Sequence, residues 1–264
     1  MNLINATVGA GIVAVPYAIM QCGFYSGVML LLLLAYAIFE SMIILITCGL
    51  KTKTKSLEDL CLYLFDEKGF YISAGFMFMY SYGSMVAILV VIGDIVPFCV
   101  SRLFGIDMAL LDRNMVIVVV ATVAILPLSL LRDLASLSAA SLFSILSLVI
   151  LVVFVVVFGY DISIANSTYA HVEDLHFMDS DIMKGIGTLS FHYVCQHSVL
   201  LVFHSLKNPT LHNWKSVASI SMISVLAMSL VVGVAGGLLF AQSTKSNILN
   251  NFPQDREYLT CRRA

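Results

Sequence analysis

Glycine and proline interrupt the first apolar stretch of the chain, where a spanning helix would otherwise be continuous. The stretch reads MNLINATVGAGIVAVPYAIMQCG, with Gly9-Ala10-Gly11 in its middle and Pro16 close behind. Glycine costs about 1 kcal/mol and proline about 3 kcal/mol in a helix interior, so the helix is predicted to break here. Broken helices are tolerated at membrane depth where they line a cavity, and they form the substrate sites of many secondary transporters. The segment therefore predicts a transport site.

The broken segment offers groups that suit a carboxylate. The exposed amides of Gly9, Ala10 and Gly11, together with the positive end of the following half-helix, attract negative charge. Close helix packing through small residues is the alternative explanation of these glycines. Asn5 carries an amide within the same span, and an unsatisfied amide in an apolar medium costs several kcal/mol. We therefore expect Asn5 to have a partner, for which a side chain on another helix is one choice.

A second cluster lies in a later apolar segment, where Gly185 and Gly187 precede Phe191-His192-Tyr193. Glycines before a polar and aromatic cluster predict a second broken helix that faces the first. Packing between helices is the alternative role for Phe191 and Tyr193. The cluster is thus a candidate for the other wall of the same site.

Three histidines follow in this segment at spacings of five and seven residues: His192, His197 and His204. At 3.6 residues per turn these spacings do not bring all three to one face of a continuous helix, so no shared metal site is expected. His192, nearest the predicted break, is the one candidate for proton sensitivity.

Two carboxylates lie within apolar segments, where an ionisable residue is a functional hypothesis by default. Glu40 is well inside the second segment and is a candidate for proton coupling, although it could also reach the interface. Asp94 is near the outer end of the third and is expected to be structural. An intramembrane aspartyl protease would need two carboxylates at close range, and no second aspartate lies in mid-span. No enzyme is therefore expected.

The composition of the chain indicates that these residues lie on helices that span a lipid bilayer. Hydrophobic residues make up 60% of the chain and charged residues 11%, which excludes an ordinary soluble domain. A helix of about 20 apolar residues crosses the hydrocarbon core. Seven segments qualify: 2–22, 25–49, 70–99, 114–131, 134–159, 184–206 and 215–241. The chain is predicted to be an all-α polytopic membrane protein. It is expected to contact the lipid bilayer and not to bind nucleic acid.

The remaining segments are assigned outside the spans. Residues 56–66 are predicted to form a cytoplasmic interfacial helix, which begins at Ser56 as N-cap with Asp59 three residues later. Residues 160–183 are predicted to form an outward loop, and 242–264 a tail.

Orientation follows from the basic residues, which favour cytoplasmic loops. The loops after spans two, four and six hold seven: Lys51, Lys53, Lys55, Lys68, Arg132, Lys207 and Lys215. Those after spans three and five hold three: Arg102, Arg113 and Lys184. The N-terminus is therefore predicted to be cytoplasmic. Asn166-Ser167-Thr168, a glycosylation sequon, then lies outside, whereas the opposite topology of a seven-span receptor would place it in the cytoplasm.

Several segments, taken in order, resemble one known family. They are Asn2-Leu3-Ile4-Asn5-Ala6, Gly9-Ala10-Gly11-Ile12, Pro16-Tyr17-Ala18, Ile92-Gly93-Asp94, Pro127-Leu128-Ser129-Leu130, Ser190-Phe191-His192-Tyr193-Val194-Cys195 and Lys207-Asn208-Pro209-Thr210. Together they resemble the amino acid/auxin permease superfamily, and most closely the sodium-coupled neutral amino acid transporters of solute carrier family 38, of the member 11 type.

The resemblance implies a LeuT-like fold of two inverted five-helix repeats with broken helices 1 and 6. It implies sodium-coupled transport of a neutral amino acid, with proton antiport as an open addition, at the plasma membrane or an endolysosomal membrane. Asn5 and Ala6 would bind sodium, and Phe191 and Tyr193 would close over the substrate. Sodium would be the coupling ion, with no other metal or cofactor. The family's Cys-His pair is here Cys195-Gln196, with His197 one place later.

After Asn250-Asn251-Phe252-Pro253 the sequence becomes polar and basic and then stops. Compared with the family, the chain supplies the first repeat and two helices of the second, so a truncated form that does not transport alone is expected. The alternative function is that of a non-transporting isoform which associates with a full-length relative and modulates it.

Overall fold

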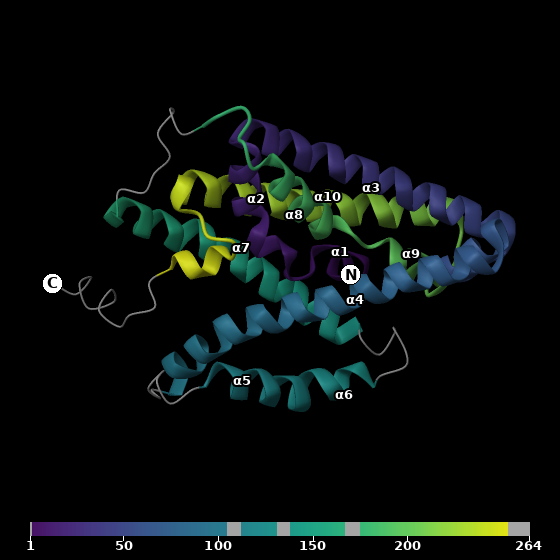
Figure 1. Cartoon of the computed structure of the whole chain (residues 1–264), viewed down its shortest axis with the longest axis horizontal. Helices are drawn as coiled ribbons and strands as arrows, with labels where there is room; N and C mark the ends of the chain where they lie inside the picture. Colours follow the sequence, from purple (N-terminus) through teal and green to yellow (C-terminus); the bar gives the residue numbers. More distant parts are fainter. Residues whose placement is uncertain (1, 105–111, 131–137, 167–174, 253–264) are drawn as a thin grey trace.

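The computed structural model describes residues 2–104, 112–130, 138–166 and 175–252. In this part of the chain every regular element is a helix, and the helices form one elongated bundle (Figure 1). Six segments are long and apolar enough to cross a membrane: Asn2–Cys22, Phe24–Thr52, Leu57–Pro97, Ser141–Tyr160, Ile182–His204 and Leu211–Phe240. The expectation of a polytopic helical membrane protein is therefore confirmed.

The first span is broken in the middle, as its glycines predicted. It consists of α1 (Asn2–Val8), a 3₁₀ segment (Gly9–Ala14) and α2 (Val15–Cys22). Gly9 adopts φ +45°, a left-handed conformation in which a residue with a Cβ is strained. The break is therefore a tightened 3₁₀ turn rather than an extended, fully unwound strand.

The sixth predicted span is also broken, but not at its glycines. Helix α8 (Ile182–Tyr193) contains Gly185 and Gly187, and α9 (Gln196–His204) follows after Val194 and Cys195. Val194 is extended, with φ −66° and ψ 112°. Gly185 instead permits close packing, because a Cβ there would lie 2.6 Å from the carbonyl oxygen of Ala18 on α2.

Helices α3 (Phe24–Thr52) and α10 (Leu211–Phe240) run side by side and enclose the first span together with α8 (Figure 1). Small residues of α10 allow this approach. A Cβ on Gly233 would lie 2.6 Å from Ile19, and one on Gly236 would lie 2.7 Å from Pro16. Membrane helices use such small residues because they gain packing contacts without a hydrophobic driving force. Helix α2 is consequently among the most buried parts of the bundle.

Helix α4 (Leu57–Phe104) includes the predicted interfacial helix. Phe65 and Asp66 have non-helical dihedral angles, so a kink divides a short first part from the long remainder. The predicted N-cap is confirmed, since the Ser56 hydroxyl accepts a hydrogen bond of 3.1 Å from the amide of Asp59. Beyond the kink, apolar residues such as Phe76 and Phe78 lie on the surface, as expected of a lipid-facing helix.

Two predicted segments differ from the structure. The segment 114–131 is helical as α5 (Arg113–Val120), a π-helical turn (Ala121–Ile125) and α6 (Leu126–Ser129), and it is shorter than the six membrane-length helices. Helix α7 (Ser138–Asn166) extends into the predicted outward loop 160–183. The apolar pattern stops at Tyr160 although the helical backbone continues, because hydropathy reports the bilayer boundary rather than the end of a helix. Residues 131–137 and 253–264 lie outside the described part.

The predicted tail returns to the bundle. A 3₁₀ turn (Ile248–Asn251) lies close to the broken first span, and Ile248 is fully buried. Phe252 contacts the rings of Phe154 and Phe240 at centroid distances of 4.8 and 5.7 Å. This segment therefore belongs to the packed structure.

Candidate functional site

A cavity of about 530 Å³ lies against the break in the first span. Its walls come from α1, the 3₁₀ segment, α4, α8, the start of α9 and the segment before Ile248. They include Asn5, Ala6, Gly9, Gly11, Tyr80, Asp94, Thr188, Phe191, His192, His197, Ser246 and Asn247. The two predicted broken helices thus line one cavity, of a size typical of small-molecule sites.

Gly9 and Gly11 line the cavity for different physical reasons. Nothing lies within 4 Å of a Cβ built on Gly9, so its left-handed backbone, not lack of space, requires glycine. A Cβ on Gly11 would lie 3.0 Å from Nδ1 and 3.1 Å from Cα of His192. Gly11 therefore allows the 3₁₀ segment to pack directly against α8. Ala10 lies between them in the same segment.

Asn5 has a partner on a distant helix. The hydroxyl of Ser144 on α7 donates a hydrogen bond of 2.6 Å to Oδ1 of Asn5. Ala6 and Asn5 both line the cavity. The amide oxygen keeps one lone pair, because a carbonyl oxygen accepts two hydrogen bonds. The expectation that Asn5 requires a partner is met by the interhelical bond, and this leaves its predicted role in sodium binding open.

His192 is held by a chain of hydrogen bonds from α10. Its Nε2 lies 2.7 Å from Oγ of Ser229. The Ser229 hydroxyl is in turn placed to donate a hydrogen bond of 2.8 Å to the carbonyl oxygen of Val225. His192 is 2% exposed, and its Nδ1 has no hydrogen-bond partner in the described part of the protein. The ring thus presents one fixed and one unpaired nitrogen.

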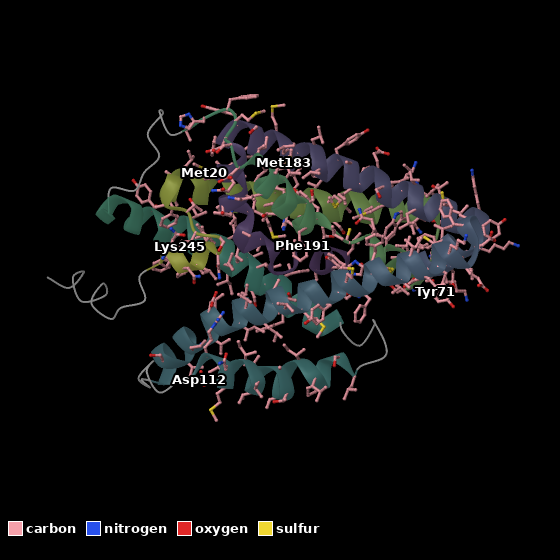
Figure 2. The ribbon with its side chains drawn as sticks, viewed as in Figure 1. Met20, Tyr71, Asp112, Met183, Phe191 and Lys245 are labelled. Atoms are coloured by element: carbon pink, nitrogen blue, oxygen red, sulfur yellow. The ribbon has the colours of Figure 1, made fainter. Side chains whose placement is uncertain are left out.

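An aromatic group forms the wall between α4 and the break in the sixth span. The ring centroid of Tyr80 lies 5.6 Å from that of Phe191 and 5.1 Å from that of His197. The Tyr80 hydroxyl donates a hydrogen bond of 3.1 Å to the carbonyl oxygen of Val194. This bond satisfies a backbone group freed by the break, which an apolar environment requires. In Figure 2 Phe191 lies near the middle of the view, with Tyr71 and Asp112 toward its edges.

Two predicted site residues lie away from this cavity. Tyr193 is fully buried beside His192 and does not line it. Glu40 lines a separate hollow of about 330 Å³ between α3 and the first part of α4, with Leu60 and Leu64 on the opposite wall. The structure therefore does not bring Glu40 together with the other predicted residues.

Asp94 lines the cavity and is paired. Its Oδ1 lies 2.9 Å from a guanidinium nitrogen of Arg113 on α5, which is consistent with the predicted structural role. Asn166 ends α7, and its side chain is outside the described set. Among the described residues no three His, Cys, Asp or Glu side chains gather to hold a metal ion.

His197 and Tyr80 are the contributors that the sequence did not reveal. On one continuous helix His192 and His197 would lie on different faces, but the chain is not helical at Val194 and Cys195, so that spacing does not apply. Both histidines line the cavity, and Nδ1 of His197 is also buried without a partner. Tyr80 lies in an apolar helix rich in aromatic residues, and no local signal distinguishes it from its neighbours.

Comparison with known proteins gives one family and several relatives. The model of the family described as transmembrane amino acid transporter protein matches residues 1–262. The mouse "Putative sodium-coupled neutral amino acid transporter 11" is 30% identical over 265 residues, covering 98% of this chain and 57% of the mouse protein. The zebrafish protein of that name is 31% identical, covering 95% and 56%. The yeast "Vacuolar amino acid transporter 2" is 28% identical, covering 96% and 54%. The chain thus spans a little over half the length of these relatives.

Proposed function

Because the chain belongs to the transmembrane amino acid transporter family, we propose that it binds a neutral amino acid for sodium-coupled secondary transport. This family lies within the amino acid/auxin permease superfamily, and the chain is similar to members of solute carrier family 38. The family and the names of these relatives indicate transporters, not enzymes. The observation that carries the proposal is the cavity of about 530 Å³ bounded by both broken spans.

The substrate carboxylate would lie against Gly9, Ala10 and Gly11. The space beside Gly9 is open, so the backbone is approachable there. The following helix α2 begins at Val15 and directs its positive end toward the same segment. Helix ends of this kind face anionic substrate groups in transporters with broken helices.

Phe191 would form an apolar wall for the substrate side chain. It is 39% exposed and lines the cavity. Asp94 is paired with Arg113, so the described lining offers no free charge to match a charged side chain. A neutral amino acid fits these walls best.

Sodium would bind beside Asn5 and Ala6. Sodium requires several oxygen ligands, and Oδ1 of Asn5 with Oγ of Ser144 supplies two at one place. In this proposal the ion displaces the hydrogen bond between them and takes both oxygens.

Transport would follow alternating access, in which one group of helices rocks against the other around the cavity. The junctions at Gly9 and at Val194–Cys195 are natural hinges, because each already departs from α-helical geometry. A LeuT-like repeat, proton coupling through His192 or Glu40, and a cytoplasmic N-terminus in a plasma or endolysosomal membrane remain parts of the proposal.

Sodium-dependent binding tests the proposal directly. The purified chain is incubated with labelled alanine in sodium buffer and in choline buffer of equal ionic strength. We expect saturable binding that sodium strengthens, and Asn5→Ala should weaken the apparent sodium affinity. Ser147→Ala is the matched control, because Ser147 bonds only to Phe143 of its own helix. No saturable binding of any neutral amino acid would refute the proposal.

A further inference from the structure

His192 is the residue whose chemistry the cavity leaves unused. Only 2% of its surface is exposed, and it borders the cavity. Its Nδ1 has no hydrogen-bond partner among the described residues. A buried polar atom without a partner is costly and calls for an explanation.

The hydrogen bonds of Ser229 relate the tautomer of the His192 ring to the backbone of α10. Ser229 is fully buried, and its hydroxyl is placed to donate its one hydrogen to the carbonyl oxygen of Val225, at 2.8 Å. With the hydrogen placed there, the Ser229 oxygen accepts from Nε2 of His192 at 2.7 Å, whereas a hydroxyl turned toward Nε2 would give the other tautomer. In the neutral ring the other nitrogen, Nδ1, is an acceptor. In the arrangement in which Ser229 donates to Val225, His192 therefore presents a lone pair at Nδ1.

The position of this lone pair relates it to the carboxylate site. Nδ1 lies 3.0 Å from the place that a Cβ on Gly11 would occupy, and Gly11 belongs to the segment proposed for the carboxylate. In every α-amino acid the ammonium group is attached to the carbon next to the carboxylate. A substrate held at Gly9–Gly11 therefore brings its N–H donors to this part of the cavity.

Three other polar side chains of the described lining each already have one partner, whereas Nδ1 of His192 has none. Oδ1 of Asn5 accepts from Ser144, and the carboxylate of Asp94 is paired with Arg113. The hydroxyl of Thr188 donates to its own helix, at the carbonyl oxygen of Lys184. His197 is unpaired at Nδ1, but its ring packs on Tyr80 across the break. His192 is the unpaired acceptor that faces the Gly9–Ala14 segment.

We propose that Nδ1 of His192 accepts a hydrogen bond from the α-ammonium group of the substrate, and that Ser229 positions it by fixing the ring tautomer. The inference rests on the proposed function. Nδ1 is covered in this conformation, so the bond forms when the 3₁₀ segment moves away from α8. The contact is thereby tied to a conformational step.

A pair of matched ligands tests this inference on the purified chain. Alanine and its N,N,N-trimethyl derivative share the carboxylate, the side chain and the positive charge, but only alanine has N–H donors. We expect the wild type to prefer alanine, and His192→Ala to reduce alanine affinity about tenfold or more while leaving the trimethyl derivative nearly unchanged. His192→Asn places an amide oxygen close to the position of Nδ1 and should retain more affinity than His192→Gln, which reaches toward the position of Nε2.

The tautomer gives a readout that does not depend on activity. Nitrogen-15 spectra of histidine-labelled protein, assigned by the loss of one signal pair in His192→Asn, should show Nε2 protonated and Nδ1 unprotonated. Ser229→Ala should mix the two tautomers, and alanine should shift the Nδ1 signal.

The outcomes separate the two proposals. If the wild type binds no neutral amino acid, the proposed function fails and this inference falls with it. If it binds alanine but the trimethyl derivative competes equally well, or if His192→Ala leaves the preference unchanged, the contact with His192 is refuted and water satisfies Nδ1.

Discussion

Ser144 on α7 and Asn5 on α1 are 139 residues apart in sequence, yet the Ser144 hydroxyl donates a hydrogen bond of 2.6 Å to the Asn5 side chain. The bond ties the first half of the broken span to α7, which packs against it. It also places two oxygen atoms together at the edge of the cavity. One contact therefore both holds α1 against α7 and supplies the two oxygen atoms proposed to bind sodium.

Stability measurements should reveal this coupling. Removing either partner leaves the other unsatisfied, so Ser144→Ala and Asn5→Ala should each destabilise the protein by about 1–3 kcal/mol. The double variant should cost less than the sum, with a coupling of about 0.5–3 kcal/mol. Thermal unfolding of the four proteins in one detergent measures it, with Ser147→Ala as the control for loss of a hydroxyl on α7. Strict additivity would show that the bond contributes nothing.

The left-handed backbone at Gly9 gives a second prediction. Any L-residue with a Cβ is strained by about 1–2 kcal/mol at φ +45°, although the space around Gly9 is open. Gly9→Ala should therefore lower stability, and Gly9→Asn should lower it less because asparagine tolerates this conformation better. Equal stability of Gly9→Ala and the wild type would mean that the break does not require a positive φ.

Gly11 should respond differently, because its constraint is space. A valine side chain would collide with His192 and fill the proposed carboxylate site. We expect Gly11→Val to abolish alanine binding while the chain still inserts and extracts as a monodisperse protein. Gly187→Val is the matched control on α8, where nothing lies within 4 Å of a Cβ. Normal binding by Gly11→Val would contradict the site at the broken first span.

The bond from Tyr80 to the carbonyl of Val194 predicts a local effect. Tyr80→Phe removes the hydroxyl that satisfies this carbonyl and should destabilise the junction between α8 and α9 by about 1 kcal/mol. Hydrogen exchange at residues 194–198 should become faster, with little change in α10. Tyr82→Phe, on the exposed side of α4, should leave that exchange unchanged. The same acceleration in both variants would mean that the hydroxyl of Tyr80 is not the cause.

Orientation can be tested with one accessible cysteine at a time. Lys53→Cys is introduced into a variant in which serine replaces every native cysteine. The new cysteine should be protected from an impermeant thiol reagent in intact cells. Asn166→Gln should remove a glycan and increase electrophoretic mobility. Labelling of residue 53 from outside would reverse the proposed topology.

The sequence by itself determined the helical membrane class, the family and the break in the first span, because these depend on local properties. Hydropathy over about 20 residues identifies a span, and a Gly-Ala-Gly triplet weakens a helix wherever it lies. The N-cap at Ser56 is equally local, since its partner Asp59 is three residues away. The family followed from short motifs that keep their order along the chain.

Only the tertiary structure decided which residues share the cavity. The break at Val194–Cys195 lies several residues after the glycines that suggested it, and His192 and His197, one on each side of it, line the same cavity. Ser144, Ser229 and Tyr80 act through partners 139, 37 and 114 residues away. Such contacts depend on how helices pack, which hydropathy and local spacing do not encode. Tyr193 and Glu40 lie away from the cavity for the same reason: the direction of a side chain follows from the rotation of its helix against its neighbours.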